Sequence, residues 1–202
     1  MKYKKSKEMP SILQRCADLG YAIFTKKDYD LNIIGVRSPN RIAGKFDDEI
    51  HCVYKERGEW VHETYQATTD PSAEQHLNPS NAKGVAILKA GQYRGAYCLD
   101  LHRNSYLALC QRKSEVVVYR DQTRDKISDI GGDTREDKGY FGINIHRAAS
   151  AQNGSLAIST RYYSAGCQVF VHPADFARFI ALCEMQVGAG VGDTFSYTLL
   201  ED

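Results

Sequence analysis

The sequence predicts a single mostly β domain, a β-rich sandwich or barrel with a short N-terminal helix and a second helix near the C-terminus. The chain has 202 residues and is 43% hydrophobic, which is enough for one sizeable core. Short apolar or alternating stretches recur from residue 21 onward, separated by clusters of Gly, Asn, Asp and Pro. Many short strands at such spacing indicate a closed or sandwiched, mostly antiparallel sheet. Helical spacing of apolar residues marks only two segments.

The first segment with helical spacing is 11–19. Ile12, Cys16 and Leu19 fall on one stripe and Gly20 is a stop signal, so a short amphipathic helix is predicted. The lysine-rich residues 2–7 before it are expected to be disordered, the simplest interpretation of a basic tip. Residues 1–20 are therefore interpreted as an N-terminal tail followed by a short helix.

The stretches that follow have the length and composition of strands. They are residues 31–36, 50–54, 60–68, 85–88, 97–101, 107–109, 116–119, 141–145 and 167–171. A second helix is predicted from Pro173, which suits the first helical position, because apolar residues then recur at helical steps as far as Val187. A glycine-rich run ends this helix, and residues 195–200 are predicted to return as a strand. No internal repeat or linker is visible, so residues 1–202 are expected to form one domain.

The charge balance excludes some partners. The chain has 26 Lys and Arg against 25 Asp and Glu, a net charge of +1, which favours neither nucleic acid nor an anionic membrane surface. No stretch is apolar over the roughly 20 residues of a membrane span, and the start lacks the apolar core of a signal peptide. We therefore expect no nucleic-acid partner, no membrane insertion, and synthesis in the cytoplasm without a recognisable signal.

The six cysteines are scattered without CxxC pairs, so neither a zinc site nor a redox pair is predicted, and no cofactor is expected. Residues 121–133 carry several carboxylates around glycines and faintly resemble a calcium loop. Lys126 occupies the position where such a loop has glycine, so a solvated turn is favoured and no metal is assigned.

The pattern that carries chemistry joins His146 and Cys167. A predicted strand ends in His146, a polar stretch of about twenty residues follows, and Ser-Ala-Gly then precedes Cys167 at the start of another strand. A free thiol is mostly protonated at neutral pH, so a cysteine nucleophile needs an imidazole within hydrogen-bond reach. Cys167 is the predicted nucleophile and His146 its base. Asn144, on the same strand face as His146 by alternation, is predicted to assist that base.

The residues around Cys167 suggest how a developing oxyanion is held. Gly166 lets the chain turn tightly, so the backbone N–H groups of Gly166, Cys167 and Gln168 are the predicted donors. Ser164 is expected either to support the loop through a side-chain hydrogen bond or to contact substrate.

These residues resemble the L,D-transpeptidase catalytic domain of the YkuD type, whose hallmark is His-Gly, a loop, then Ser-His-Gly-Cys. The matching residues are His146, Ser164, Gly166 and Cys167, and the resemblance covers about 49–187, with only the 40 residues around His146 and Cys167 specific. Three positions depart from the pattern: Arg147, Ala165 and Val169 stand where the family has glycine, histidine and arginine.

The resemblance implies a barrel or sandwich with the cysteine at its rim and an acyl-enzyme mechanism on peptidoglycan stem peptides. Tyr163 and Arg147 are expected to contact that substrate. Action at a cell wall requires release or a dedicated export route. The missing family histidine favours peptide cleavage over cross-linking. A non-catalytic wall-binding or structural module with the same fold is the alternative of a different class, and a nucleic-acid-binding module is the third. The sequence leaves the oligomeric state open.

Overall fold

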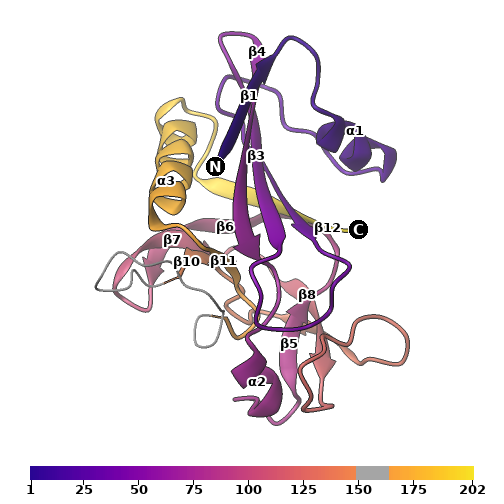
Figure 1. Cartoon of the computed structure of the whole chain (residues 1–202). Coiled ribbons are helices and arrows are strands. Elements are labelled where there is room, and N and C mark those ends of the chain that lie inside the picture. Colours follow the sequence, from indigo (N-terminus) through magenta and orange to yellow (C-terminus); the bar gives the residue numbers. More distant parts are fainter. Residues whose placement is uncertain (149–163) are drawn as a thin grey trace.

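Eight strands close into a barrel in the computed structural model, which describes residues 1–148 and 164–202 (Figure 1). Around the barrel their order is β4-β11-β10-β7-β6-β12-β2-β3, and β3 pairs with β4 to close it. The β10–β11 and β12–β2 pairs are parallel and the others antiparallel. The strands are β2 (Asn32–Arg37), β3 (Asp48–Glu56), β4 (Glu59–Thr68), β6 (Gly91–His102), β7 (Tyr106–Gln111), β10 (Ile145–Arg147), β11 (Gln168–Phe170) and β12 (Thr194–Glu201). The predicted mostly β, mostly antiparallel fold is confirmed, with a closed barrel.

One end of the barrel is covered by a small sheet and a one-turn helix. The sheet has the order β5-β8-β9 and lies with the helix at the lower end of Figure 1. Its apolar side chains join the same core cluster as the barrel interior, which buries both layers against each other. The elements are α2 (Ala73–Leu77), β5 (Val85–Leu88), β8 (Val116–Asp121) and β9 (Glu136–Gly139).

The predicted C-terminal helix is confirmed as α3 (Pro173–Gly188), with proline at its start. Its apolar stripe joins the barrel core through Phe176, Phe179, Leu182 and Cys183. A buried ion pair fixes its angle: Arg178 Nη2 donates to Glu63 Oε1 at 2.7 Å, and Glu63 is fully buried on β4. The hydroxyl groups of Tyr54 and Tyr65 donate to the same carboxylate, which compensates its loss of hydration.

The predicted N-terminal helix is confirmed as α1 (Ser11–Asp18). It packs on the outside of the barrel wall through a second cluster of Leu13, Cys16, Ile34, Val53, Trp60 and Leu200. The expectation of a disordered start before it is wrong, because Lys2–Ser6 form β1, an antiparallel partner of β4. β1 forms because β11 pairs with β4 only at Ala67 and Thr68. The rest of that edge of β4 offers unpaired N–H and C=O groups, with which the start of the chain pairs.

Two local predictions differ from the structure. The expected strand 141–145 is largely coil, and only Ile145 enters β10. The N–H groups of Phe141 and Ile143 both donate to Gln111 Oε1, so a side chain takes the place of a strand partner there. Helix α2 was not predicted at all. Within residues 1–148 and 164–202, no helix has both the length and the apolar character needed to cross a membrane.

Candidate active site

His146 lies on β10, and Cys167 immediately precedes β11, the parallel neighbour of β10. Ile145 and Phe170, which register next to them, belong to the main core, so the alternate residues of β10 and β11 face outward. Cys167 accordingly packs beside Val169 in a separate outer cluster. Strand spacing and rise place the Cα atoms of His146 and Cys167 roughly 8 Å apart. The adjacency expected of the two strands is present.

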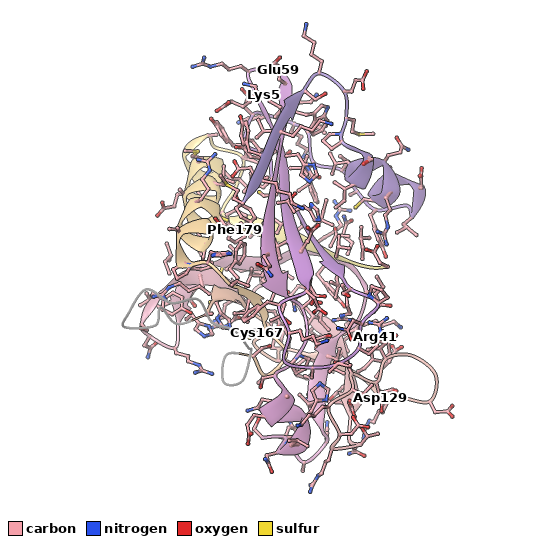
Figure 2. All side chains as sticks on the ribbon, in the orientation of Figure 1. Lys5, Arg41, Glu59, Asp129, Cys167 and Phe179 are labelled. Carbon is pink, nitrogen blue, oxygen red and sulfur yellow. The ribbon has the colours of Figure 1, made fainter. Side chains whose placement is uncertain are left out.

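In Figure 2 Cys167 lies below Phe179 and above Asp129. Its Sγ atom accepts a hydrogen bond from the Asn144 N–H and donates to the carbonyl oxygen of Gly142, each at 3.4 Å. A carbonyl can only accept, so this arrangement holds the thiol protonated. Burial raises the pKa of Cys167, while the Asn144 N–H and the charge of Arg103 lower it. The resting thiol is therefore neutral.

His146 is held by a backbone carbonyl. Its Nδ1 atom lies 3.0 Å from the carbonyl oxygen of Arg147 and 3.4 Å from the Tyr106 hydroxyl. Because the carbonyl must accept, Nδ1 carries the proton and Nε2 keeps its lone pair. Burial, and to a smaller extent the neighbouring His102, lower the pKa of His146 to about 3, so the ring is neutral at pH 7. Among the described residues, no hydrogen bond joins His146 to Cys167.

The turn before Cys167 is fixed by Ser164 and Gly166. The Ser164 hydroxyl donates to the Cys167 carbonyl at 2.8 Å and accepts the Gly166 N–H at 3.1 Å, which is the loop-supporting role expected of it. Gly166 has φ +119, and a Cβ there would overlap the carbonyl oxygen of Ala86 on β5. Only glycine permits this approach, so the turn rests directly on the small sheet.

Two of the three predicted oxyanion donors are already engaged. The Gly166 N–H donates to Ser164, and the Gln168 N–H donates to the carbonyl oxygen of Asn144 at 2.9 Å. The side chain of Gln168 faces the barrel interior, where it accepts from the Tyr197 hydroxyl at 2.9 Å. Within the described part of the chain, the Cys167 N–H makes no hydrogen bond and is left as the donor nearest the thiol.

The side chain of Asn144 contacts His102 and not His146, the base that it was predicted to assist. Its Oδ1 accepts from the Gln111 N–H at 2.9 Å, and its Nδ2 lies 3.1 Å from His102 Nδ1. His102 in turn stacks on His146, with ring centroids 4.2 Å apart and planes 21° apart. The sequence analysis missed His102, because only the strand order of the barrel brings the β6–β7 hairpin beside β10.

The surroundings of the two histidines are cationic. The Arg147 guanidinium lies 4.5 Å from the Tyr106 ring centroid, beside the base. Arg103, in the hairpin turn after His102, contributes to lowering the pKa of both Cys167 and His146, so its charge reaches both groups. Arg103 has φ +50, an uncommon conformation for a residue with a Cβ. Tyr163, the other predicted substrate contact, lies outside the described residues.

The carboxylate-rich loop 121–133 is held by its own hydrogen bonds. Asp121 accepts from Thr123 and from the Asp129 N–H, and its Oδ2 lies 3.2 Å from His76 Nδ1. Elsewhere in the described ranges, no group of three His, Cys, Asp or Glu side chains has the geometry of a metal site. The interpretation of this loop as a turn agrees with these contacts.

Comparison with known proteins identifies no relative: no family model, no curated protein and no solved structure matches the chain. The resemblance to the L,D-transpeptidases therefore depends on its own motif residues.

Proposed function

We propose that the protein is a cysteine-dependent acyl transferase with Cys167 as nucleophile and His146 as base. The observation that carries the proposal is the pair itself. His146 lies on β10 and Cys167 directly precedes the adjacent β11, so strand alternation puts both residues on one face. The Arg147 carbonyl fixes the His146 proton on Nδ1, which leaves the Nε2 lone pair to accept a proton. A base oriented by a hydrogen bond on its far nitrogen is a recurring feature of nucleophilic sites.

The reaction proceeds by proton transfer and acyl transfer. His146 Nε2 takes the proton from Cys167 Sγ, and the thiolate attacks a peptide carbonyl carbon to form a tetrahedral intermediate. The Cys167 N–H supports the oxyanion. The C–N bond then breaks as His146 returns the proton to the leaving amine, and a thioester remains. Water or a second amine resolves the thioester, which gives hydrolysis or cross-linking.

The proton must leave sulfur only when substrate is present. In the resting site the Gly142 carbonyl accepts from the thiol, and burial disfavours both the thiolate and the imidazolium. Substrate binding that displaces this carbonyl contact would leave the Asn144 N–H as a donor to the sulfur, which stabilises the thiolate. A thiol that is inert without substrate also avoids oxidation.

The substrate class follows from the motif resemblance rather than from the pocket. Ser164, Gly166 and Cys167 with His146 match the L,D-transpeptidase pattern, so we propose peptidoglycan stem peptides as the acyl donor. Ala165 in place of the family histidine favours cleavage over cross-linking. A non-catalytic wall-binding module is the second candidate, and the raised thiol pKa together with the engaged Sγ atom favours it.

The first experiment compares thiol reactivity. Intact-mass detection of a carbapenem adduct and of iodoacetamide alkylation at pH 7 is made on wild type, Cys167→Ala and His146→Asn. Cys98→Ala is the matched control, since Cys98 is a partly exposed strand cysteine on β6 that stands outside the pair. An adduct that vanishes in Cys167→Ala, survives in Cys98→Ala and falls strongly in His146→Asn supports the enzyme.

Muropeptides then separate the two reactions. New amine and carboxyl ends indicate cleavage, whereas dimers alone indicate cross-linking and overturn the cleavage assignment. If Cys167 reacts with neither carbapenem nor iodoacetamide in the presence of muropeptides, the acyl-transfer proposal fails and the wall-binding module takes its place.

A further inference from the structure

The inference concerns His102, which lies against the base without touching the nucleophile. It is 6% exposed and ends β6, directly opposite Tyr106 across the hairpin. Its ring stacks on His146 nearly in parallel, at a centroid distance of 4.2 Å. A second imidazole stacked on a base repels the imidazolium of that base when it is itself charged and does not when it is neutral, so the charge state of His102 decides its effect on His146.

The hydrogen bonds of Asn144 decide which charge state His102 has. The Gln111 backbone N–H can only donate, so the Asn144 atom 2.9 Å from it is the oxygen. The amide nitrogen therefore faces His102 Nδ1 at 3.1 Å, and that nitrogen can only donate. His102 Nδ1 must accept, its proton is on Nε2, and a second proton at Nδ1 would face the amide N–H groups.

The other groups that face the two rings are cations and a phenol. Arg103 follows His102 in the hairpin turn, Arg147 follows His146 on β10, and the Tyr106 hydroxyl from β7 contacts His146 Nδ1. Cys167 directly precedes β11, the strand next to β10. Burial lowers the pKa of His102, and Arg103 and Arg112 lower it further, in agreement with the hydrogen-bond argument.

We propose that His102 is a positioning residue for the base: Asn144 holds it neutral, so its stacked ring orients His146 without repelling the imidazolium that forms when His146 takes the Cys167 proton. The proposal rests on the function proposed above. The four residues form one relay, from the Gln111 N–H through Asn144 to His102 and so to His146.

The tautomers are tested without any reaction. ¹⁵N NMR of the imidazole rings in the full-length protein at pH 7 is expected to show His102 neutral with its proton on Nε2, and His146 neutral with its proton on Nδ1. In Asn144→Asp the carboxylate still accepts from Gln111 but now also accepts from His102, so the His102 proton moves to Nδ1. A charged His102 in wild type, or an unchanged tautomer in the variant, overturns the relay.

The stacking is tested by the pH profile of Cys167 alkylation. His102→Ala removes the ring that orients His146 and is expected to lower the alkylation rate about 10-fold, part of the contribution of a well-positioned general base. His102→Phe keeps a neutral ring, so the alkylation rate is expected to fall by less than threefold. His102→Lys places a cation beside the base, which lowers the pKa of His146. The alkylation rate is expected to fall about 100-fold, and the acid limb of its pH profile to move to lower pH.

The control for these variants is His62→Phe, since His62 on β4 forms a second, partly buried histidine pair with His51 on β3. Equal losses for Phe, Ala and Lys at position 102, with an unmoved pH profile, would show that His102 is only structural. If wild-type Cys167 never reacts, the proposed function fails, and the NMR tautomers still decide whether the histidine relay exists.

Discussion

Gly166→Ala should damage both the fold and the candidate site, because Gly166 carries the turn that presents Cys167. At φ +119 an added Cβ is strained by about 1–3 kcal/mol. The same Cβ would overlap the Ala86 carbonyl oxygen and stand 3.0 Å from Ile143 Cδ1. This oxygen belongs to the backbone of β5, which cannot move without its sheet. The resulting overpacking adds about 1–3 kcal/mol to the cost. The expected loss of unfolding free energy is about 2–6 kcal/mol.

Urea unfolding of Gly166→Ala and wild type, together with the Cys167 alkylation rate, measures both effects. Gly192→Ala is the matched control, since Gly192 also has positive φ, at +149, but a Cβ there meets nothing within 4 Å. Gly192→Ala should lose only the strain and leave the alkylation rate unaltered. A Gly166→Ala protein as stable as the Gly192→Ala protein would refute the argument that close approach to β5 requires glycine.

Three further outcomes are expected. Burial and Asp70 raise the pKa of Asp48 to about 6 from 3.8, so the folded state binds this proton more tightly than the unfolded state. The free energy of unfolding therefore gains about 2 kcal/mol as pH falls from 6 to 4; a carboxyl ¹³C titration midpoint near 4 would contradict this. Burial lowers the pKa of His51 to about 3 from 6.5, so the unfolded state binds this proton first and stability falls as pH drops below 6.5; His51→Gln should flatten that part of a pH series of urea unfolding curves. Arg178→Ala leaves the buried Glu63 carboxylate without its cation and should cost about 3–5 kcal/mol, whereas Arg112→Ala, which breaks the exposed Arg112–Asp100 pair, should cost less than about 1 kcal/mol in the same assay.

Sequence periodicity predicted the elements whose signals are local. The apolar stripe that ends before Gly20 predicted α1, and the apolar residues at helical steps after Pro173 predicted α3. Both signals are local, because amphipathic spacing and stop residues act within one element. Helix α2 also carried a local signal, since Ser72 caps it by accepting from the Gln75 N–H, in the serine-x-x-glutamine spacing of a capping box. That signal was overlooked because the helix is only one turn long.

The remaining features depend on contacts between distant segments. β1 forms because β4 leaves half an edge unpaired, and lysines at positions 2, 4 and 5 give no hint of that edge. His102 joins the site because the barrel places the β6–β7 hairpin beside β10. The adjacency of the two strands at His146 and Cys167 was predicted from motif spacing alone. The engagement of the Gly166 and Gln168 N–H groups could not be predicted, because it depends on the geometry of the turn.

The strands at the candidate site pair with their neighbours over fewer residues than the other strands of the barrel. In the described strands, β10 and β11 register over three residue pairs with each other, β11 over two with β4, and β10 over one with β7, whereas β3 and β4 share nine. Backbone amides here should therefore exchange with deuterium through local opening, at far lower free energy than the β3–β4 ladder. Such local opening would give a peptide substrate access to the buried His146 side chain while the rest of the barrel stays folded.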